Sequence, residues 1–104
     1  MIIRVFRARV HDGKQKKFEK FLHEHAVPLL RKQTGILSIQ LGTPTEHTPE
    51  EFVVISTWKD LNALKGFTGE QWQEPVIDPN EKDLLAETFL HHYFVLEKDK
   101  KENK

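Results

Sequence analysis

The chain contains no cysteine, which excludes disulfide bonds, thiolate metal ligands and a cysteine nucleophile. It also has no apolar run that approaches the roughly 20 residues needed for a membrane-spanning helix. Residues 1–4 lead directly into a strand-like pattern, so no signal peptide is expected ahead of them. We therefore expect a protein without a membrane partner, located in the cytoplasm.

Charge of one sign is also lacking, because 16 basic and 16 acidic side chains cancel. No global field then attracts the chain to nucleic acid or to an anionic membrane. The sequence has no glycine-rich phosphate loop, no catalytic serine motif and no carboxylate pair at a telling spacing. Nucleotide-dependent and serine-hydrolase classes are disfavoured, and no metal site is predicted.

The run Phe-Val-Val-Ile-Ser-Thr-Trp at residues 52–58 is the densest stretch of β-branched and aromatic residues in the chain. Phe52, Val54 and Trp58 fall on one face of such a strand, while Val53 and Ile55 fall on the other. Apolar residues on both faces are typical of a central strand that is covered on both sides. The second face of the sheet must therefore also be buried.

The other elements follow from the hydrophobic periodicity of the sequence and from the positions of its capping, glycine and proline residues. An amphipathic helix is predicted from Lys14 to about Gln33, with a capping box formed by Asp12 and Gln15 and a kink at Pro28. Asp60 should cap a short helix that ends near Gly66. The remaining predicted segments are strands at residues 2–10, 36–42 and 84–97, a loop at 43–50, and a lid-like loop at 68–81.

The order strand, helix, strand, strand, helix, strand predicts an α+β, ferredoxin-like split β-α-β fold (βαββαβ) with a four-stranded antiparallel sheet. Strands one and three would be central, and two helices would cover one face. The other face would remain apolar, which predicts a homodimer through the sheet face. A single domain is expected at residues 1–97, followed by a charged, disordered tail at 98–104. An RNA-binding module of similar order is disfavoured, since its stacking motif is missing.

Several of these segments resemble the antibiotic biosynthesis monooxygenase family. The resemblance rests on the Ile2-Ile3-Arg4-Val5 strand that leads to His11-Asp12-Gly13-Lys14, the helix with Phe18, the Thr34-Gly35-Ile36 turn, and Val54-Ile55-Ser56-Thr57-Trp58. It covers about residues 2–97 and implies a dimeric α+β barrel. It further implies a cofactor-independent monooxygenase that oxidises a small aromatic phenol or quinol with molecular oxygen, with haem binding or degradation as an alternative.

The resemblance also implies site residues. Trp58 occupies the position of a tryptophan that the family shares. Val54 and Leu64 stand where the polyketide oxygenases have an asparagine and a tyrosine, and Phe6 and Thr68 stand where the haem-degrading branch has an asparagine and a histidine. Trp58 is the only member of either set that is present. This departure favours the alternative of a non-enzymatic dimer that binds a small ligand or is purely structural.

Candidate site residues follow, each with a structural alternative. Trp58 either borders a substrate pocket or belongs to the core or dimer interface. His91 and His92 are adjacent on a strand, so they point to opposite faces. One of them is a candidate general base or haem ligand, and the alternative interpretation is that it is a hydrogen-bonded structural histidine. Phe6, Val54, Leu64 and Trp72 are candidate substrate contacts, with Trp72 on a flap or packed against a neighbouring subunit.

Two further groups have a mainly structural interpretation. His25 lies near the apolar stripe of the first helix and can reach a pocket, whereas His23 should be solvated. Arg7 and Arg9 lie on a half-buried strand and need carboxylate partners such as Glu87, another chain, or a ligand.

Overall fold

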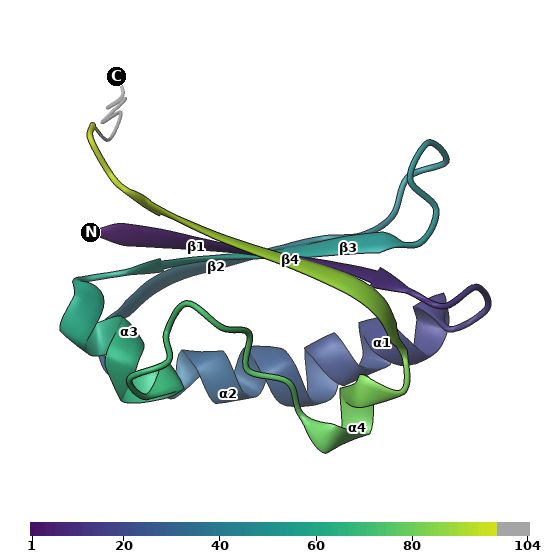
Figure 1. Cartoon of the computed structure of the whole chain (residues 1–104), viewed down its shortest axis with the longest axis horizontal. Helices are drawn as coiled ribbons and strands as arrows, with labels where there is room; N and C mark the ends of the chain where they lie inside the picture. Colours follow the sequence, from purple (N-terminus) through teal and green to yellow (C-terminus); the bar gives the residue numbers. More distant parts are fainter. Residues whose placement is uncertain (98–104) are drawn as a thin grey trace.

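A computed structural model describes residues 1–97; the predicted tail at residues 98–104 lies outside the described part of the chain. The elements, in chain order, are β1 (Ile2–Val10), α1 (Gln15–Phe21), the π-helix η1 (Leu22–Ala26), α2 (Val27–Arg31), β2 (Ile36–Gly42), β3 (Glu51–Trp58), α3 (Leu61–Thr68), α4 (Pro79–Lys82) and β4 (Leu85–Phe94). The helices lie on one side of a single sheet (Figure 1). No helix in residues 1–97 is long and apolar enough to cross a membrane.

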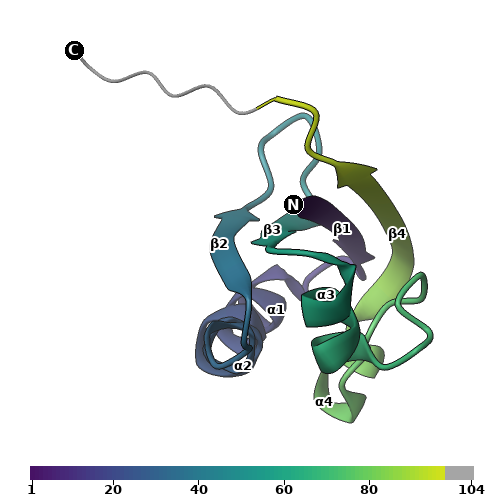
Figure 2. The same cartoon turned by 90° about the vertical axis from the view of Figure 1, so that its left-hand side faces the viewer.

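The sheet is antiparallel, with the strand order β2-β3-β1-β4 (Figure 2). β1 and β3 are central and β2 is an edge strand, as the sequence predicts. This arrangement confirms the ferredoxin-like α+β fold. In the register of the sheet, Arg4 of β1 lies opposite Ser56 of β3 on one side and opposite His92 of β4 on the other.

The predicted two-faced pattern of β3 is confirmed, since every second residue from Phe52 to Trp58 is buried against the helices. These side chains meet Phe18, Leu64 and other apolar residues in a core whose largest fully buried members are Trp58, Phe18 and Phe52. Val53 and Ile55 point to the face without helices. The core therefore occupies one side of the sheet only.

The predicted long helix is interrupted. Residues Leu22–Ala26 form a π-helix, and Pro28 follows in the first turn of α2, where it has no N–H to donate to the preceding turn. The predicted capping box at Asp12 is wrong: Lys14 is the N-cap and makes no side-chain cap, and the Gln15 amide donates to the Pro49 carbonyl instead. A tertiary contact between Gln15 and the loop before β3 thus replaces the predicted local cap.

Three further boundaries differ from the sequence prediction. α3 is capped by Asp60 as expected but extends to Thr68, where Gly69 takes a positive φ. The segment expected to be irregular contains α4, which Asp78 and Glu81 start with a capping box. β4 ends at Phe94 rather than at residue 97. Within β2, a register shift between Ile36 and Ser38 leaves Leu37 exposed.

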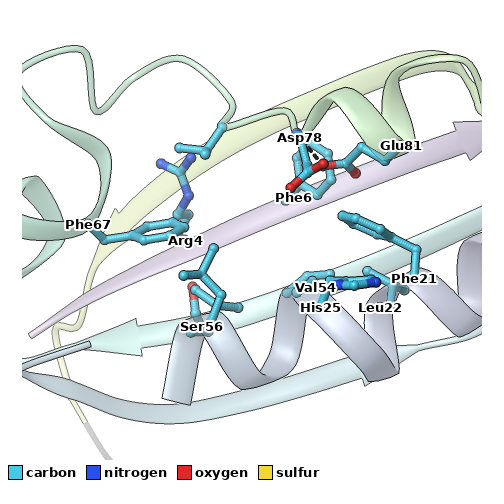
Figure 3. A pocket seen from close by; sticks show the side chains of 14 residues that line it. Arg4, Phe6, Phe21, Leu22, His25, Val54, Ser56, Phe67, Asp78 and Glu81 are labelled. Atoms are coloured by element: carbon cyan, nitrogen blue, oxygen red, sulfur yellow. Dashed lines mark hydrogen bonds between the residues drawn. The ribbon is translucent and has the colours of Figure 1, made fainter. Parts of the chain in front are cut away.

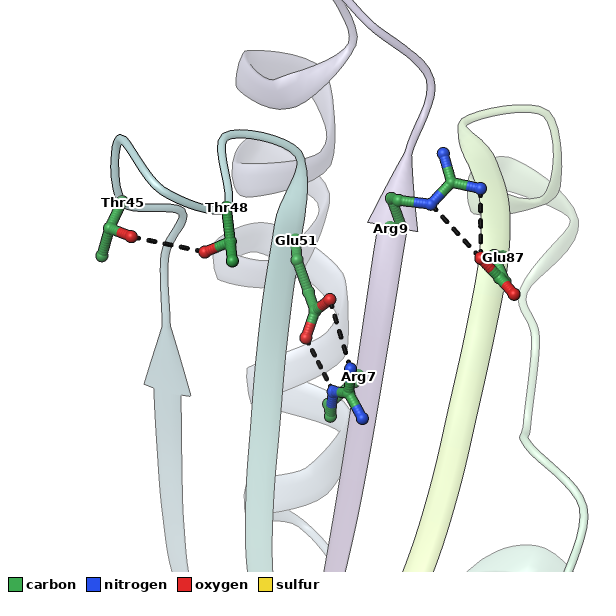
Figure 4. Close-up of polar contacts among 6 residues, drawn as sticks. All are labelled: Arg7, Arg9, Thr45, Thr48, Glu51 and Glu87. Carbon is green, nitrogen blue, oxygen red and sulfur yellow. Dashed lines mark hydrogen bonds and ion pairs between the residues drawn. The ribbon is translucent and has the colours of Figure 1, made fainter.

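The sheet face opposite the helices combines apolar residues with ion pairs. Arg7 donates through Nε to Glu51 at 2.7 Å, and Arg9 donates through Nη2 to Glu87 at 3.1 Å (Figure 4). The predicted pairing with Glu87 is confirmed. No helix in residues 1–97 covers this face (Figure 1).

The turn before β2 gives a test of the packing between α3 and the sheet. Gly35 has a φ of +86°, and a Cβ there would clash with the Cβ of Ala63. We expect Gly35→Ala to lower the free energy of unfolding by about 2–4 kcal/mol, from the left-handed backbone together with the clash. Urea denaturation measures the loss.

Gly13→Ala is the matched control for that substitution. Gly13 also has a φ of +86°, but a Cβ there meets nothing within 4 Å. Its cost should be the backbone strain alone, about 1–2 kcal/mol. Equal losses in the two variants would show that Ala63 moves away freely and that the contact does not constrain α3.

Candidate functional site

A cavity of about 140 Å³ lies between the helix layer and the sheet (Figure 3). Its walls are mainly apolar and aromatic, which is typical of small-molecule sites. The lining residues are Arg4, Phe6, Phe21, Leu22, His25, Ala26, Leu29, Leu30, Val54, Ser56, Phe67, Val76, Asp78 and Glu81. Figure 3 shows Arg4 and Phe67 at one end, and Asp78 and Glu81 at the other.

The central strands and the interrupted helix place these side chains. Arg4 and Phe6 on β1 pair with Ser56 and Val54 on β3, so the four form a two-by-two patch on the sheet floor. The opposite wall comes from η1 and α2. Leu22 and Ala26 of η1 and Leu29 of α2, spaced four and three residues apart, line this wall. π-helical turns occur frequently at functional sites.

Arg4 is a buried cation, with 5% of its surface exposed. Its Nη1 donates to the Trp72 carbonyl at 2.7 Å and contacts His92 Nε2 at 2.9 Å, and its Nη2 donates to the Glu74 carbonyl at 3.2 Å. Burial lowers the pKa of Arg4 to about 10, which still leaves it protonated at neutral pH. A charged group therefore borders an apolar cavity.

His92 completes this arrangement as a neutral imidazole. Arginine can only donate, so His92 Nε2 must accept, which places the ring proton on Nδ1. Burial, and then the charge of Arg4, lower the pKa of His92 to about 4. The ring also meets Trp72 edge-on at 4.8 Å between centroids. The basic nitrogen of His92 is thus already engaged in positioning Arg4.

At the other end of the cavity, Glu81 is a buried carboxyl group. Burial raises its pKa, and its Oε2 accepts a hydrogen bond from the backbone N–H of Asp78 at 3.0 Å. Residues 1–97 provide no ion-pair partner for Glu81. A carboxyl group with a raised pKa in a cavity is a candidate proton acceptor or donor.

Trp58 lies behind the cavity rather than on its wall. It is fully buried, and its Nε1 donates to Ser56 Oγ at 3.0 Å. Its ring stacks on Phe67 at 5.6 Å between centroids, and Phe67 is the lining residue of that pair. In the described part of the chain, Trp58 reaches the cavity only through these two neighbours.

The other predicted site residues are distributed among several places. Phe6 and Val54 line the cavity, and Leu64 is fully buried in the core. Trp72 holds Arg4 through its carbonyl and His92 through its ring. His91 points to the opposite, exposed face, as its adjacency to His92 predicts. Their roles in substrate binding or catalysis stay predictions.

Both predictions for the helix histidines agree with the structure. His25 lines the cavity beside Phe21, whose ring it contacts at 5.6 Å. The His23 side chain is 64% exposed. Residues 1–97 contain no group of three or more His, Cys, Asp or Glu residues that could hold a metal ion.

The sequence reasoning missed Arg4, Ser56 and Glu81. Of the three arginines on β1, only Arg4 shares the parity of the buried face. Strand parity could have separated it from the others. Asp78 followed by Pro79 and Glu81 is a helix-start signal, and it could have revealed α4 and the buried carboxyl group.

This geometry defines a ferredoxin-like α+β protein with a cavity for a small molecule between sheet and helices. The sequence model described as "Antibiotic biosynthesis monooxygenase" matches residues 1–73, and the chain belongs to this family. No curated protein matches it. The matched part includes Arg4, Ser56 and Trp58, whereas Asp78, Glu81 and His92 lie beyond it.

Solved structures share the fold at low sequence identity. A Nitrosomonas europaea protein that bears the family's name is 17% identical, with a TM-score of 0.74 over 93% of this chain and 100% of that chain. A variant of SnoaB, a cofactor-independent oxygenase from Streptomyces nogalater, is 18% identical, with a TM-score of 0.69 over 93% and 94%. A variant of MhuD with two manganese protoporphyrin IX molecules bound per active site is 16% identical, with a TM-score of 0.72 over 95% and 98%.

The contact between Arg4 and His92 predicts a pH dependence of stability. The pKa of His92 falls from 6.5 to about 4 on folding, so between these values the unfolded chain binds a proton that the folded chain does not. This contribution to stability is present above pH 6.5 and is lost as the pH falls toward 4. We expect His92→Gln, which keeps a hydrogen-bond acceptor, to remove most of this loss in urea unfolding across the range.

Glu81 acts with the opposite sign, because its raised pKa stabilises the fold at low pH and that contribution is lost as the pH rises. The contribution of Glu81 is present in the wild type and in His92→Gln, so it cancels when the pH profiles of the two proteins are compared. His47→Gln, in the exposed loop between β2 and β3, is the control and should keep the wild-type profile. An unchanged profile in His92→Gln would contradict the assignment of a neutral, half-buried imidazole.

Proposed function

We propose that the protein is a cofactor-independent monooxygenase that acts on a small aromatic phenol or quinol with molecular oxygen. The observation that supports this most directly is the aromatic-walled cavity with one buried cation, Arg4, and one buried carboxyl group, Glu81. Membership of the monooxygenase family and the fold shared with SnoaB add to it. The substrate itself would supply the electrons that reduce oxygen.

In such a reaction the enzyme binds, orients and desolvates a substrate that reacts with oxygen once it is deprotonated. For an anthrone-like substrate, a ring CH₂ and O₂ give a ring C=O and water, so one oxygen atom enters the product and the other leaves as water. Phe6, Phe21 and Phe67 would hold the flat ring and exclude solvent. Each of these residues lies on a different element, so the cavity fixes the ring from several sides.

Glu81 is the proposed proton acceptor. It lines the cavity, and its raised pKa brings it closer to the pH at which a general base works best. A histidine of the last strand was the sequence prediction for this role. His92 keeps its basic nitrogen on Arg4, and His91 lies on the far face, so Glu81 is the better placed group.

The proposal includes a homodimer formed through the helix-free face of the sheet, in the cytoplasm. Ile3, Val5, Val53 and Ile55 lie on this face beside the half-exposed Tyr93, and they are only partly buried by their own chain. A second copy would cover them by a two-fold contact, the commonest arrangement for a soluble protein.

Oxygen uptake with a panel of quinols and anthrone-like phenols tests the activity, with heat-denatured protein correcting for autoxidation. We expect Ala26→Phe to reduce enzyme-dependent uptake at least about tenfold, because the added ring fills the cavity from η1. Glu24→Phe places the same side chain on the exposed side of η1 and should leave uptake unchanged.

A different outcome would favour the alternative of a ligand-binding dimer without chemistry. If the panel gives no enzyme-dependent uptake, while ligands bind saturably and Ala26→Phe blocks that binding, the oxygenase proposal fails and the binding module stands.

Haem binding is supported by one specific observation, namely His25 at the cavity. A Soret shift on addition of haemin that is lost in His25→Ala would favour this second candidate. An unchanged haemin spectrum would leave the cofactor-independent proposal in place.

The proposed dimer predicts the effect of a charge at the centre of the uncovered face. Ile55→Lys should convert a dimer to a monomer in light scattering coupled to size exclusion, because the buried ammonium groups would lack partners. Leu29→Lys, an exposed position in the helix layer, should remain dimeric. A wild-type monomer at micromolar concentration, or a dimeric Ile55→Lys variant, would contradict the proposed interface.

A further inference from the structure

Arg4 is a buried charge without a countercharge. Residues 1–97 place no carboxylate within ion-pair distance of its guanidinium, whereas Arg7 and Arg9 on the same strand are both paired with glutamates. Buried charges in proteins are ordinarily paired, because removal from water costs far more than surface exposure does. The cavity that Arg4 lines is a place where a group carrying the countercharge can enter.

The hydrogen bonds of Arg4 leave room for such a group. A guanidinium has five N–H donors. Two on Nη1 are directed to the Trp72 carbonyl and to His92, and one on Nη2 is directed to the Glu74 carbonyl. The Nε–H and the second Nη2–H have no hydrogen-bond partner in the described residues. Nε and Nη2 are neighbours on one edge of the guanidinium plane, which suits an anionic oxygen group.

Ser56 supplies a further donor beside Arg4. The two residues are directly paired between β1 and β3, and both line the cavity. Ser56 is 2% exposed, and its Oγ accepts the indole N–H of Trp58. Its own O–H therefore remains available to donate. Trp58 thus acts as a positioning residue that sets the orientation of the serine hydroxyl.

The remaining charged and titratable groups at the cavity are compatible with an anion at this end. Asp78 and Glu81 lie at the opposite end of the cavity from Arg4 (Figure 3). His25 is on the helix wall, and His92 is held as a neutral acceptor by Arg4. Apolar walls strengthen any charge pair that forms there, because the local dielectric constant is low.

We infer that Arg4 and Ser56 form a binding site for an anionic oxygen on an aromatic ligand, that is, a phenolate, an enolate or a carboxylate. The inference deepens the proposed function and rests on its cavity. For a phenol substrate, the site would stabilise the ionised form that reacts with oxygen. Arg4 and Ser56 would then hold the charge, and Glu81 would take up the proton from another part of the ring system.

The competing interpretation is that Arg4 is only a structural clip. Its bonds to the carbonyls of Trp72 and Glu74 fasten the segment after α3 to the sheet, and this alone could account for the residue. The two interpretations differ in one property: a clip has no effect on the ionisation of a bound ligand, whereas an anion site favours the charged form.

The test uses 4-nitrophenol, which ionises near neutral pH and whose phenolate is yellow. Absorbance titration with saturating protein gives the pKa of the bound probe. We expect wild-type protein to lower that pKa by at least about one unit, a tenfold preference for the phenolate. The methyl ether 4-nitroanisole, which cannot ionise, should bind correspondingly more weakly.

Variants assign the effect to the two residues. Arg4→Met should abolish the shift, Ser56→Ala should reduce it, and Arg4→Lys should keep part of it, since the charge remains but the planar edge is lost. Arg9→Met, the same substitution on the exposed face of β1, should behave as wild type. If Arg4→Met does not fold, Arg4→Lys, Ser56→Ala and the wild-type comparison of ether and phenol decide the matter.

A second pair of probes separates the possible sources of the anion. 4-Nitrobenzoate is compared with 4-nitrobenzamide by calorimetry. Preference for the benzoate without a shift in nitrophenol ionisation identifies a carboxylate site, and the reverse identifies a phenolate or enolate site. If the wild-type protein prefers the neutral member of both pairs, or binds none of the four compounds, the inference is wrong.

Failure of this inference and failure of the proposed function can be told apart. Oxygen uptake that is unaffected by Arg4→Lys or Ser56→Ala would retain the oxygenase and remove the anion site. A shifted probe pKa without oxygen uptake on any substrate would retain the anion site and remove the oxygenase.

Discussion

The contacts of Arg4 join three parts of the molecule that are far apart in the sequence. From the middle of the sheet, its guanidinium reaches the carbonyls of Trp72 and Glu74 and the imidazole of His92. The segment after α3 is thereby held over the cavity, and the imidazole is held neutral. The cation is buried at a cost that carbonyl dipoles offset only in part. This one charge thus contacts both the segment that covers the cavity and the last strand.

Much of the fold could be predicted from the sequence, because its signals are local. The run of β-branched and aromatic residues at 52–58 identified a central strand with two apolar faces, and Asp60 identified the start of α3. The interruption of the first helix was anticipated only as a kink at Pro28. A π turn is a response to tertiary packing as well as to proline, so the sequence alone does not indicate where the extra residue is accommodated.

The site was less accessible to prediction. Phe6 and Val54 were found through positions of the family motif, and both line the cavity. His92 was a candidate from the sequence, but its contact with Arg4 joins two residues that are 88 positions apart. No local pattern encodes such a contact. Trp58 is a site residue predicted from the sequence, and its position behind Phe67 and Ser56 depends on side-chain packing that periodicity does not determine.

The π-helix at Leu22–Ala26 has a consequence for how this wall of the cavity is built. Each residue of a regular α-helix turns the chain by about 100°. The π segment holds one residue more than the regular turn would, so it resets the rotational phase of α2 relative to α1. Phe18 and Phe21 ahead of it and Leu30 after it are all buried with that offset in place. The length of this segment, and not only its composition, therefore sets which side chains form the wall.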